Sequence, residues 1–178
     1  MRLICESCNH GYSPKLPNCP WCNALADFAH QSTITSCLDI EVYRDYFLAR
    51  FDTGECYQMF PGHELDIAGL KQTLSRYTLV TFNGINYDIP IIQIALDGRT
   101  NAQLKQASDK LIVEQTKYWE LLREYNATQL DIDHIDIMNV APGAGGLKEY
   151  GAKLHTRKLQ DLPIDPSASI AWHDRVLL

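Results

Sequence analysis

Two acidic residues in one short segment have a spacing that could bind divalent cations. Asp39 and Glu41 flank a single apolar residue, Ile40. Side chains alternate between the two faces of a β-strand, so both carboxylates would lie on the same face. Two ionised carboxylates placed this way repel each other, and a divalent cation between them removes the repulsion. A polar, solvent-facing side of a strand would have the same pattern.

A further carboxylate ends the polar segment Asn83–Asp88, which reads Asn-Gly-Ile-Asn-Tyr-Asp. This segment follows a short apolar run, 79–82, and precedes an apolar stretch, 89–96, that we expect to be a helix. Asp88 would therefore lie at a helix N-terminus, a favourable place for an anion or its metal. The alternative is that Asp88 only caps this helix.

Four cysteines near the start form two Cys-x-x-Cys pairs, Cys5 with Cys8 and Cys19 with Cys22. Each pair can place two sulfurs on a tight turn, and four thiolates make the tetrahedral set that Zn²⁺ accepts in closed, structural sites. A pair of disulfides or an iron site are the alternatives. The two remaining cysteines have no partner motif, and we expect both to be buried thiols: Cys37 and Cys56.

The composition is that of an ordinary protein of 178 residues, with 46% hydrophobic and 21% charged residues. The net charge of −6 argues against binding nucleic acid by electrostatics alone, although carboxylates can reach phosphates through bound cations. No apolar run approaches the ~18 residues of a membrane span, and the start does not read as a signal peptide. We therefore expect a cytoplasmic protein with reduced cysteines.

The elements that must position these residues fall into two parts. Residues 1–30 hold the four paired cysteines and predict a small zinc ribbon, and residues 31–178 predict a larger domain. In the larger part, hydrophobic periodicity predicts an antiparallel three-stranded meander, followed by helices that alternate with further strands. The expected strands are 33–43, 45–52, 55–60, 79–82 and 132–140, and the expected helices are 66–77, 89–96, 101–126 and 147–154. This order indicates an α/β fold with a mixed sheet.

The two acidic motifs, in this order and on these elements, resemble those of the DEDD 3′–5′ exonucleases. The first family motif is Asp-x-Glu on the first strand, and the second is Asn-x-x-x-(Phe/Tyr)-Asp, matched by Asn83, Tyr87 and Asp88. The surrounding FNGINYDIPII looks most like the proofreading domains of family-B DNA polymerases and related phage exonucleases. The later IDIMNVAPGAGGLKEYGAKL is similar to the strand, loop and helix that follow there. The resemblance covers about residues 32–178 and implies an RNase H-like fold.

The resemblance also implies an activity, which is hydrolysis of phosphodiester bonds at a DNA 3′ end. Asp39, Glu41 and Asp88 would bind two Mg²⁺ or Mn²⁺ ions. Asn83 and Tyr87 would bind substrate, and Asp136 could help them or could be a solvated strand residue. The implied partners are single-stranded DNA and a DNA polymerase or other replication protein, in the host cytoplasm if the chain is phage-encoded.

The sequence departs from the family at its third motif. That motif is Tyr-x-x-x-Asp, or His followed five residues later by Asp, on a late helix, and neither pattern follows Asp88. We expect it a few residues beyond Leu178. The alternative is a catalytically incomplete module that keeps the exonuclease fold and binds nucleic acid or protein.

Overall fold

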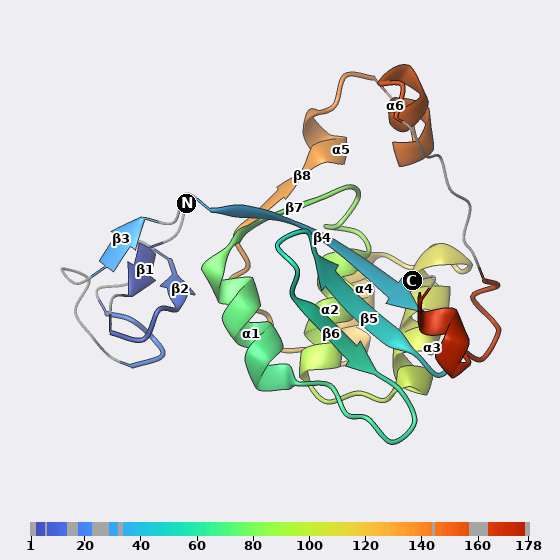
Figure 1. Ribbon diagram of the computed structural model, residues 1–178, viewed down its shortest axis with the longest axis horizontal. Coiled ribbons are helices and arrows are strands. Elements are labelled where there is room, and N and C mark those ends of the chain that lie inside the picture. Colours follow the sequence, from blue (N-terminus) through green and yellow to red (C-terminus); the bar gives the residue numbers. More distant parts are fainter. Residues whose placement is uncertain are drawn as a thin grey trace.

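The computed structural model describes residues 3–5, 7–13, 18–22, 29–31, 34–143, 145–156 and 164–176. Within these ranges the chain forms a three-stranded sheet and a five-stranded sheet, with helices packed on the larger one (Figure 1). None of the helices in these ranges is long and apolar enough to cross a membrane.

The small sheet belongs to the N-terminal cysteine module. Its central strand, β1 (Leu3–Cys5), pairs antiparallel with β2 (Gly11–Tyr12) on one side and β3 (Ala29–Gln31) on the other. The module therefore continues to Gln31, one residue past the boundary expected from the cysteine spacing. In Figure 1 it lies beside α1 (Ile67–Arg76), outside the five-stranded sheet.

The large sheet has the strand order β6-β5-β4-β7-β8. Its first three strands along the chain form an antiparallel meander, and β7 and β8 are parallel to β4. The predicted α/β fold, with a mixed sheet of antiparallel and then parallel strands, is confirmed. The strands are β4 (Thr35–Val42), β5 (Phe47–Phe51), β6 (Cys56–Met59), β7 (Thr78–Thr81) and β8 (His134–Asp136).

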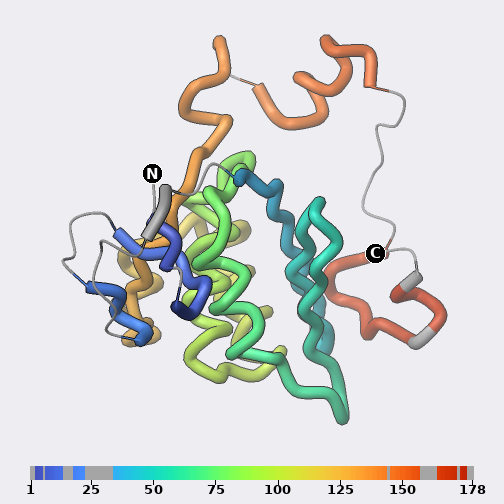
Figure 2. Tube along the Cα trace, turned by 60° about the vertical axis from the view of Figure 1, so that its left-hand side comes forward, coloured from blue at the N-terminus to red at the C-terminus, as the bar shows by residue number. Residues whose placement is uncertain are grey.

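One face of this sheet packs against a layer of helices (Figure 2). The layer contains α1, α2 (Asp88–Leu96), α3 (Asn101–Ile112) and α4 (Tyr118–Glu124). Alternate residues of β4, namely Leu38, Ile40 and Val42, are buried in the core that the helices share. Each fully buried side chain of this kind contributes about 1.5–3 kcal/mol. This burial fixes the register of β4 and turns Asp39 and Glu41 toward the other face.

The opposite face is covered in part by the C-terminal segment, residues 164–176, which ends in the 3-10 helix η2 (Trp172–Val176). Ile170 packs with Tyr46 and Leu48 in a second apolar cluster, and its N–H donates to Asp45 at 2.9 Å. The Arg175 guanidinium lies 3.6 Å from the ring centroid of Phe60. These contacts hold the segment against the meander.

The predicted single helix over 101–126 is wrong, because the chain forms two helices joined by residues 113–117. Gln115, in the joining segment, has φ 57°, which no continuous right-handed helix allows. The break lets α4 turn back onto α2 and α3, so that Leu121 and Leu122 reach the core. Helix-forming residues are common in both α3 and α4, so the composition does not reveal that the chain breaks between them or that α4 packs on the other helices.

The predicted strand over 132–140 is also too long. β8 stops at Asp136, and the short helix α5 (Ile137–Val140) begins directly after it. The Asp136 carboxylate accepts the Met138 N–H at 3.0 Å and so caps α5. The last expected helix is confirmed as α6 (Leu147–Lys153).

The prediction that Cys37 and Cys56 are buried is wrong, since both are exposed. Cys37 lies two residues before Asp39 on β4, so both side chains are on the face that points away from the helical core. Cys56 begins β6, which is the edge strand of the sheet.

Candidate functional site

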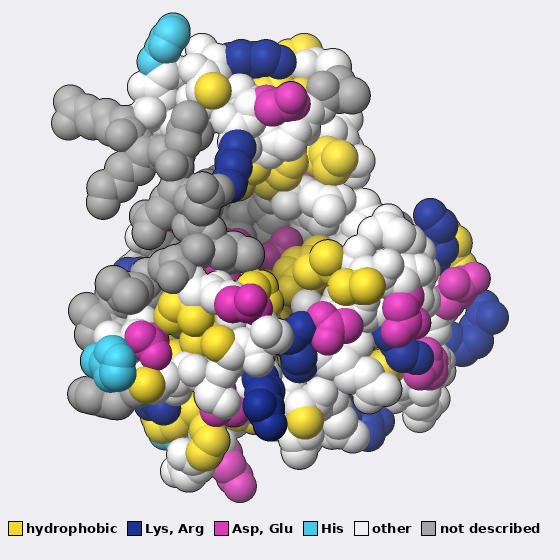
Figure 3. Space-filling model, turned by 90° about the vertical axis from the view of Figure 1, so that its right-hand side faces the viewer, with side chains coloured by type: hydrophobic (Ala, Val, Ile, Leu, Met, Phe, Trp, Pro, Cys, Tyr) yellow, Lys and Arg dark blue, Asp and Glu magenta, His cyan; other side chains and the backbone are white. Residues whose placement is uncertain are grey.

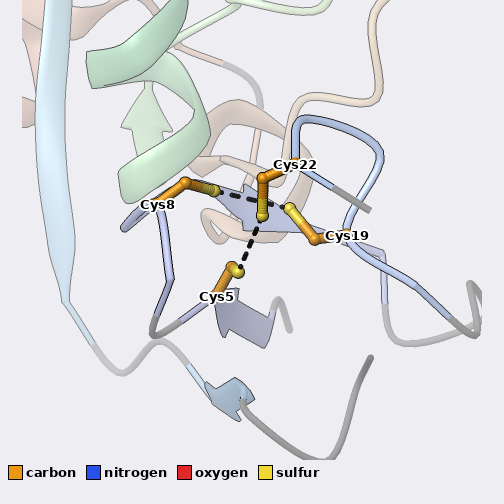
Figure 4. A group of neighbouring side chains, drawn as sticks. All are labelled: Cys5, Cys8, Cys19 and Cys22. Carbon is orange, nitrogen blue, oxygen red and sulfur yellow. Dashed lines mark hydrogen bonds between the residues drawn. The ribbon is translucent and has the colours of Figure 1, made fainter. Parts of the chain in front are cut away.

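The four predicted metal-binding cysteines converge in the N-terminal module (Figure 4). The Cys5 and Cys22 sulfurs are 3.5 Å apart, those of Cys8 and Cys19 are 3.6 Å apart, and all four lie within 4.8 Å of one another. Four sulfurs around one Zn²⁺, each at ~2.3 Å, would be separated by about 3.8 Å. The four cysteines therefore could hold a metal ion such as zinc.

Local backbone geometry explains how the first cysteine pair is formed. Asn9 adopts a left-handed conformation (φ 57°), and its N–H donates to the Cys5 carbonyl at 2.7 Å. The Cys5 N–H donates in turn to the His10 carbonyl at 3.0 Å. Burial acts to raise the pKa of Cys5, but the backbone N–H groups of Cys8 and Ser7 hold it at about 7, which favours the thiolate.

The loop between β7 and α2 carries most of the second predicted site. Asn83 has φ 64°, and its carbonyl accepts the Asn86 N–H at 3.1 Å while its side chain accepts from the Asn86 amide at 2.8 Å. The Ile89 N–H then donates to the Gly84 carbonyl at 2.9 Å. This compact turn aims the first residue of α2, Asp88, at the sheet. No side chain caps α2, so the interpretation of Asp88 as only a cap is not supported.

Asp136 fixes this loop from the neighbouring strand β8. Its carboxylate accepts the Asn83 N–H at 2.8 Å and the Ile85 N–H at 3.1 Å, in addition to the α5 cap. Asp136 is 5% exposed, so the interpretation as a solvated strand residue is wrong. The carboxylate accepts hydrogen bonds from three backbone N–H groups, so Asp136 is a positioning residue of the loop. Its predicted contact with substrate stays a prediction.

Gly84 makes the close approach of this loop to β7 possible. A Cβ atom at residue 84 would lie 1.9 Å from Thr81 Oγ1 and 2.6 Å from Thr81 Cβ. Thr81 is buried, and its hydroxyl lies 2.6 Å from His134 Nε2, so the Thr81 side chain cannot move aside without losing this contact. We therefore predict that Gly84→Ala lowers the free energy of unfolding by about 1–3 kcal/mol in urea titrations. Gly146→Ala is the control, because a Cβ there meets nothing within 4 Å; equal stability of the two variants would contradict the prediction.

Asp39, Glu41 and Asp88 interact electrostatically. Burial and the charge of Asp39 raise the pKa of Glu41 to about 7, and the same two causes raise the pKa of Asp88 to about 7. The pKa of Asp39 is also raised by the protein packed around it, although Asp39 remains an exposed residue of β4. Asp39 thus lies close enough to affect both other groups. Raised carboxyl pKa values of this kind arise where acidic side chains repel one another and are partly shielded from water.

This arrangement predicts a pH dependence of stability. With raised pKa values, the native protein keeps protons that the unfolded chain loses above the ordinary values of 4.5 for Glu and 3.8 for Asp. These carboxyls therefore lower stability progressively from about pH 4 to about pH 7, and the effect is constant above that. Urea unfolding without divalent cations should show a decline that is larger in the wild type than in the double variant Glu41→Gln, Asp88→Asn, which keeps only Asp39. The lowered pKa of His134 acts in the opposite direction but is common to both proteins. Parallel pH profiles would contradict the prediction.

A cleft of about 630 Å³ collects several predicted site residues. Asp39, Asn83, Tyr87 and Asp88 all line it. Glu41 does not line it, although its carboxyl interacts with Asp39. The Tyr87 hydroxyl lies 2.9 Å from Ser108 Oγ on α3, which anchors the Tyr87 ring in the cleft wall.

The carboxylates do not form a compact three-ligand group. Among the residues that the structure describes, only the four cysteines bring three or more His, Cys, Asp or Glu ligand atoms within 4.8 Å of one another. In Figure 3 the molecule is hollowed between the upper block, which contains α6, and the main body, and acidic side chains are visible inside. Phe82 lines the cleft, and its ring centroid is 5.9 Å from that of Tyr150 on α6.

Sequence reasoning missed a second wall of the cleft. This wall is formed by the end of α3 and the segment before α4, including Ile112, Thr116 and Lys117. The sequence did not indicate this wall because one continuous helix was expected there.

Tyr43 was also missed as a neighbour of the acidic residues. It is buried, and burial together with the charge of Glu41 raises its pKa to about 12. Its place two residues after Glu41 continues the alternation of Asp39 and Glu41 and could have identified it.

Comparison with known proteins gives no relative. No protein-family model, curated protein or solved structure matches the chain.

Proposed function

We propose that the chain is a metal-dependent 3′–5′ exonuclease with an RNase H-like fold, acting on DNA 3′ ends. The observation that carries the proposal is electrostatic. The charge of Asp39 raises the pKa values of both Glu41 and Asp88, and two of these three carboxyls, Asp39 and Asp88, line one cleft. The sheet order, with β4 in the centre and the loop after β7 beside it, supports the fold assignment.

The donor set fits hard divalent cations. It consists of carboxylate oxygens, which suit Mg²⁺ and Mn²⁺, and none of the described residues that line the cleft is a cysteine. Asp39 would contact both ions, Glu41 would complete one site and Asp88 the other. Bound ions would supply an activated water and neutralise charge at the scissile phosphate. The four cysteines would hold one Zn²⁺ with a structural role, because a closed thiolate site leaves no open position.

The residues of the chain itself would perform three tasks. Asp136 and Gly84 keep the loop against β7 and so hold Asp88 toward Asp39. Asn83 and Tyr87 shape the part of the cleft that would receive the terminal nucleotide. Asp88 is buried, and the burial that raises its pKa would also strengthen its electrostatic interaction with a bound cation.

The direct test uses single-stranded DNA labelled at its 5′ end, incubated with the protein and Mn²⁺. Exonucleolytic removal from the 3′ end would give a ladder of shortened, still labelled products, and chelation of Mn²⁺ would abolish it. The same strand with a 3′ label would release labelled mononucleotide at once. Binding without any shortening would favour the non-catalytic module.

A further inference from the structure

The second wall of the cleft includes a basic residue, and the first includes acidic ones. Lys117 is the only cation among the described residues that line the cleft. The acidic wall contributes Asp39 and Asp88, yet no ion pair between Lys117 and a carboxylate occurs within the described part of the chain. A cation left unpaired beside carboxylates is placed to bind an anion that enters the cleft.

Other lysines of the same region differ from Lys117 in this respect. Lys105 forms an ion pair with Asp109 within α3, and Lys110 forms one with Glu124 on α4. Both charges are therefore neutralised inside the helical layer. Lys117 lies in the turn between the two helices, where it is exposed and lines the cleft.

The same wall offers an apolar surface beside the cation. Leu111 and Ile112 line the cleft at the end of α3, and Ile112 is 56% exposed, so its side chain is accessible to a ligand. Tyr118 lines the cleft on the other side of Lys117. A lysine between apolar and aromatic side chains suits a ligand with alternating phosphates and bases, as a single nucleic-acid strand has.

We propose that the α3–α4 segment, residues 111–118, is the strand-binding wall of the cleft. Lys117 binds a backbone phosphate of a single-stranded DNA end, and Leu111, Ile112 and Tyr118 contact the adjoining base and sugar. The volume of about 630 Å³ is within the range of pockets that hold a small organic molecule, which suits the end of a single strand. This inference rests on the proposed function, since it names the substrate of the same cleft.

The test compares Lys117→Gln with Lys71→Gln, which removes a lysine of α1 that lines a different pocket. Binding of fluorescent oligothymidylate is followed by anisotropy with Ca²⁺, another oxygen-binding cation, in place of Mn²⁺, and the DNA length is checked after each titration. We expect Lys117→Gln to raise Kd about tenfold. It should also reduce the slope of log K against log salt by about 0.7, the value for one phosphate contact on a single strand. Lys71→Gln should change neither quantity.

Trimming kinetics with Mn²⁺ separate this inference from the proposed function. Lys117→Gln should raise KM and leave kcat unchanged, because the phosphate contact is the same in the ground and transition states. Unchanged Kd and salt slope in Lys117→Gln would overturn the inference even if the wild type trims DNA. A Lys117-dependent Kd in a protein that never trims DNA would support the strand-binding wall and overturn the nuclease proposal.

Discussion

Asp39→Asn is expected to reduce Mn²⁺-dependent trimming of a DNA 3′ end about 10³-fold. Asp39 is the carboxylate whose charge reaches both Glu41 and Asp88, so its loss affects both proposed ion positions. A metal ion stabilises transition-state charge by several kcal/mol, which corresponds to this factor. The measurement is the single-turnover rate on 5′-labelled single-stranded DNA, compared with wild type.

The matched control for this prediction is Asp131→Asn, which removes the same charge from an exposed residue before β8. It should retain the wild-type rate. Stability distinguishes loss of chemistry from loss of fold, because removing Asp39 relieves repulsion and should not lower the unfolding free energy of the metal-free protein. An Asp39→Asn protein that trims DNA at the wild-type rate would contradict the assignment of this site.

Loss of the cysteine-bound metal should have the second large effect. Structural zinc contributes an apparent ~10–16 kcal/mol in small modules, and among the residues that the structure describes the apolar cluster around these cysteines consists of Leu3, Cys5, Cys8, Tyr12 and Cys19. Cys8→Ser, or a strong chelator, should therefore unfold residues 3–31 and abolish zinc retention. Native mass spectrometry should show one zinc per wild-type chain and none in the variant.

The α/β part should survive loss of the module metal. Its core is formed by residues of the large sheet and its helices, and no described residue of the cysteine module belongs to it. Amide exchange should stay slow in β4 and α2 while the module exchanges freely. Cys37→Ser is the control, because Cys37 is an exposed thiol outside the cluster and should keep the zinc. Retention of one zinc by Cys8→Ser would contradict the four-cysteine assignment.

Local sequence signals were sufficient where one interaction dominates. The Cys-x-x-Cys spacing predicted a cluster of four cysteines because four thiolates have few arrangements around one ion. The alternation from Leu38 to Val42 predicted both the buried face of β4 and the opposite placement of Asp39 and Glu41. The loop from Asn83 to Asp88 was predicted as a turn between a buried strand and a helix.

The rest depends on contacts between distant segments. The break between α3 and α4 arises because Leu121 packs against other helices, and no local signal marks it. β8 ends at Asp136, whose carboxylate accepts hydrogen bonds from the N–H groups of Asn83 and Ile85, about fifty residues away in sequence. The wall around Lys117 exists only because that helix breaks. Sequence reasoning therefore identified one wall of the cleft and missed the other.

The central claim is that the carboxylates of Asp39, Glu41 and Asp88 share divalent cations. Titration of the zinc-loaded protein with Mn²⁺, followed by the loss of its free paramagnetic resonance signal, tests this without substrate or turnover. The account predicts up to two bound Mn²⁺ per chain near neutral pH, with binding lost in Asp39→Asn and retained in Asp131→Asn. Absence of Mn²⁺ binding, or equal binding by wild type and Asp39→Asn, would contradict it.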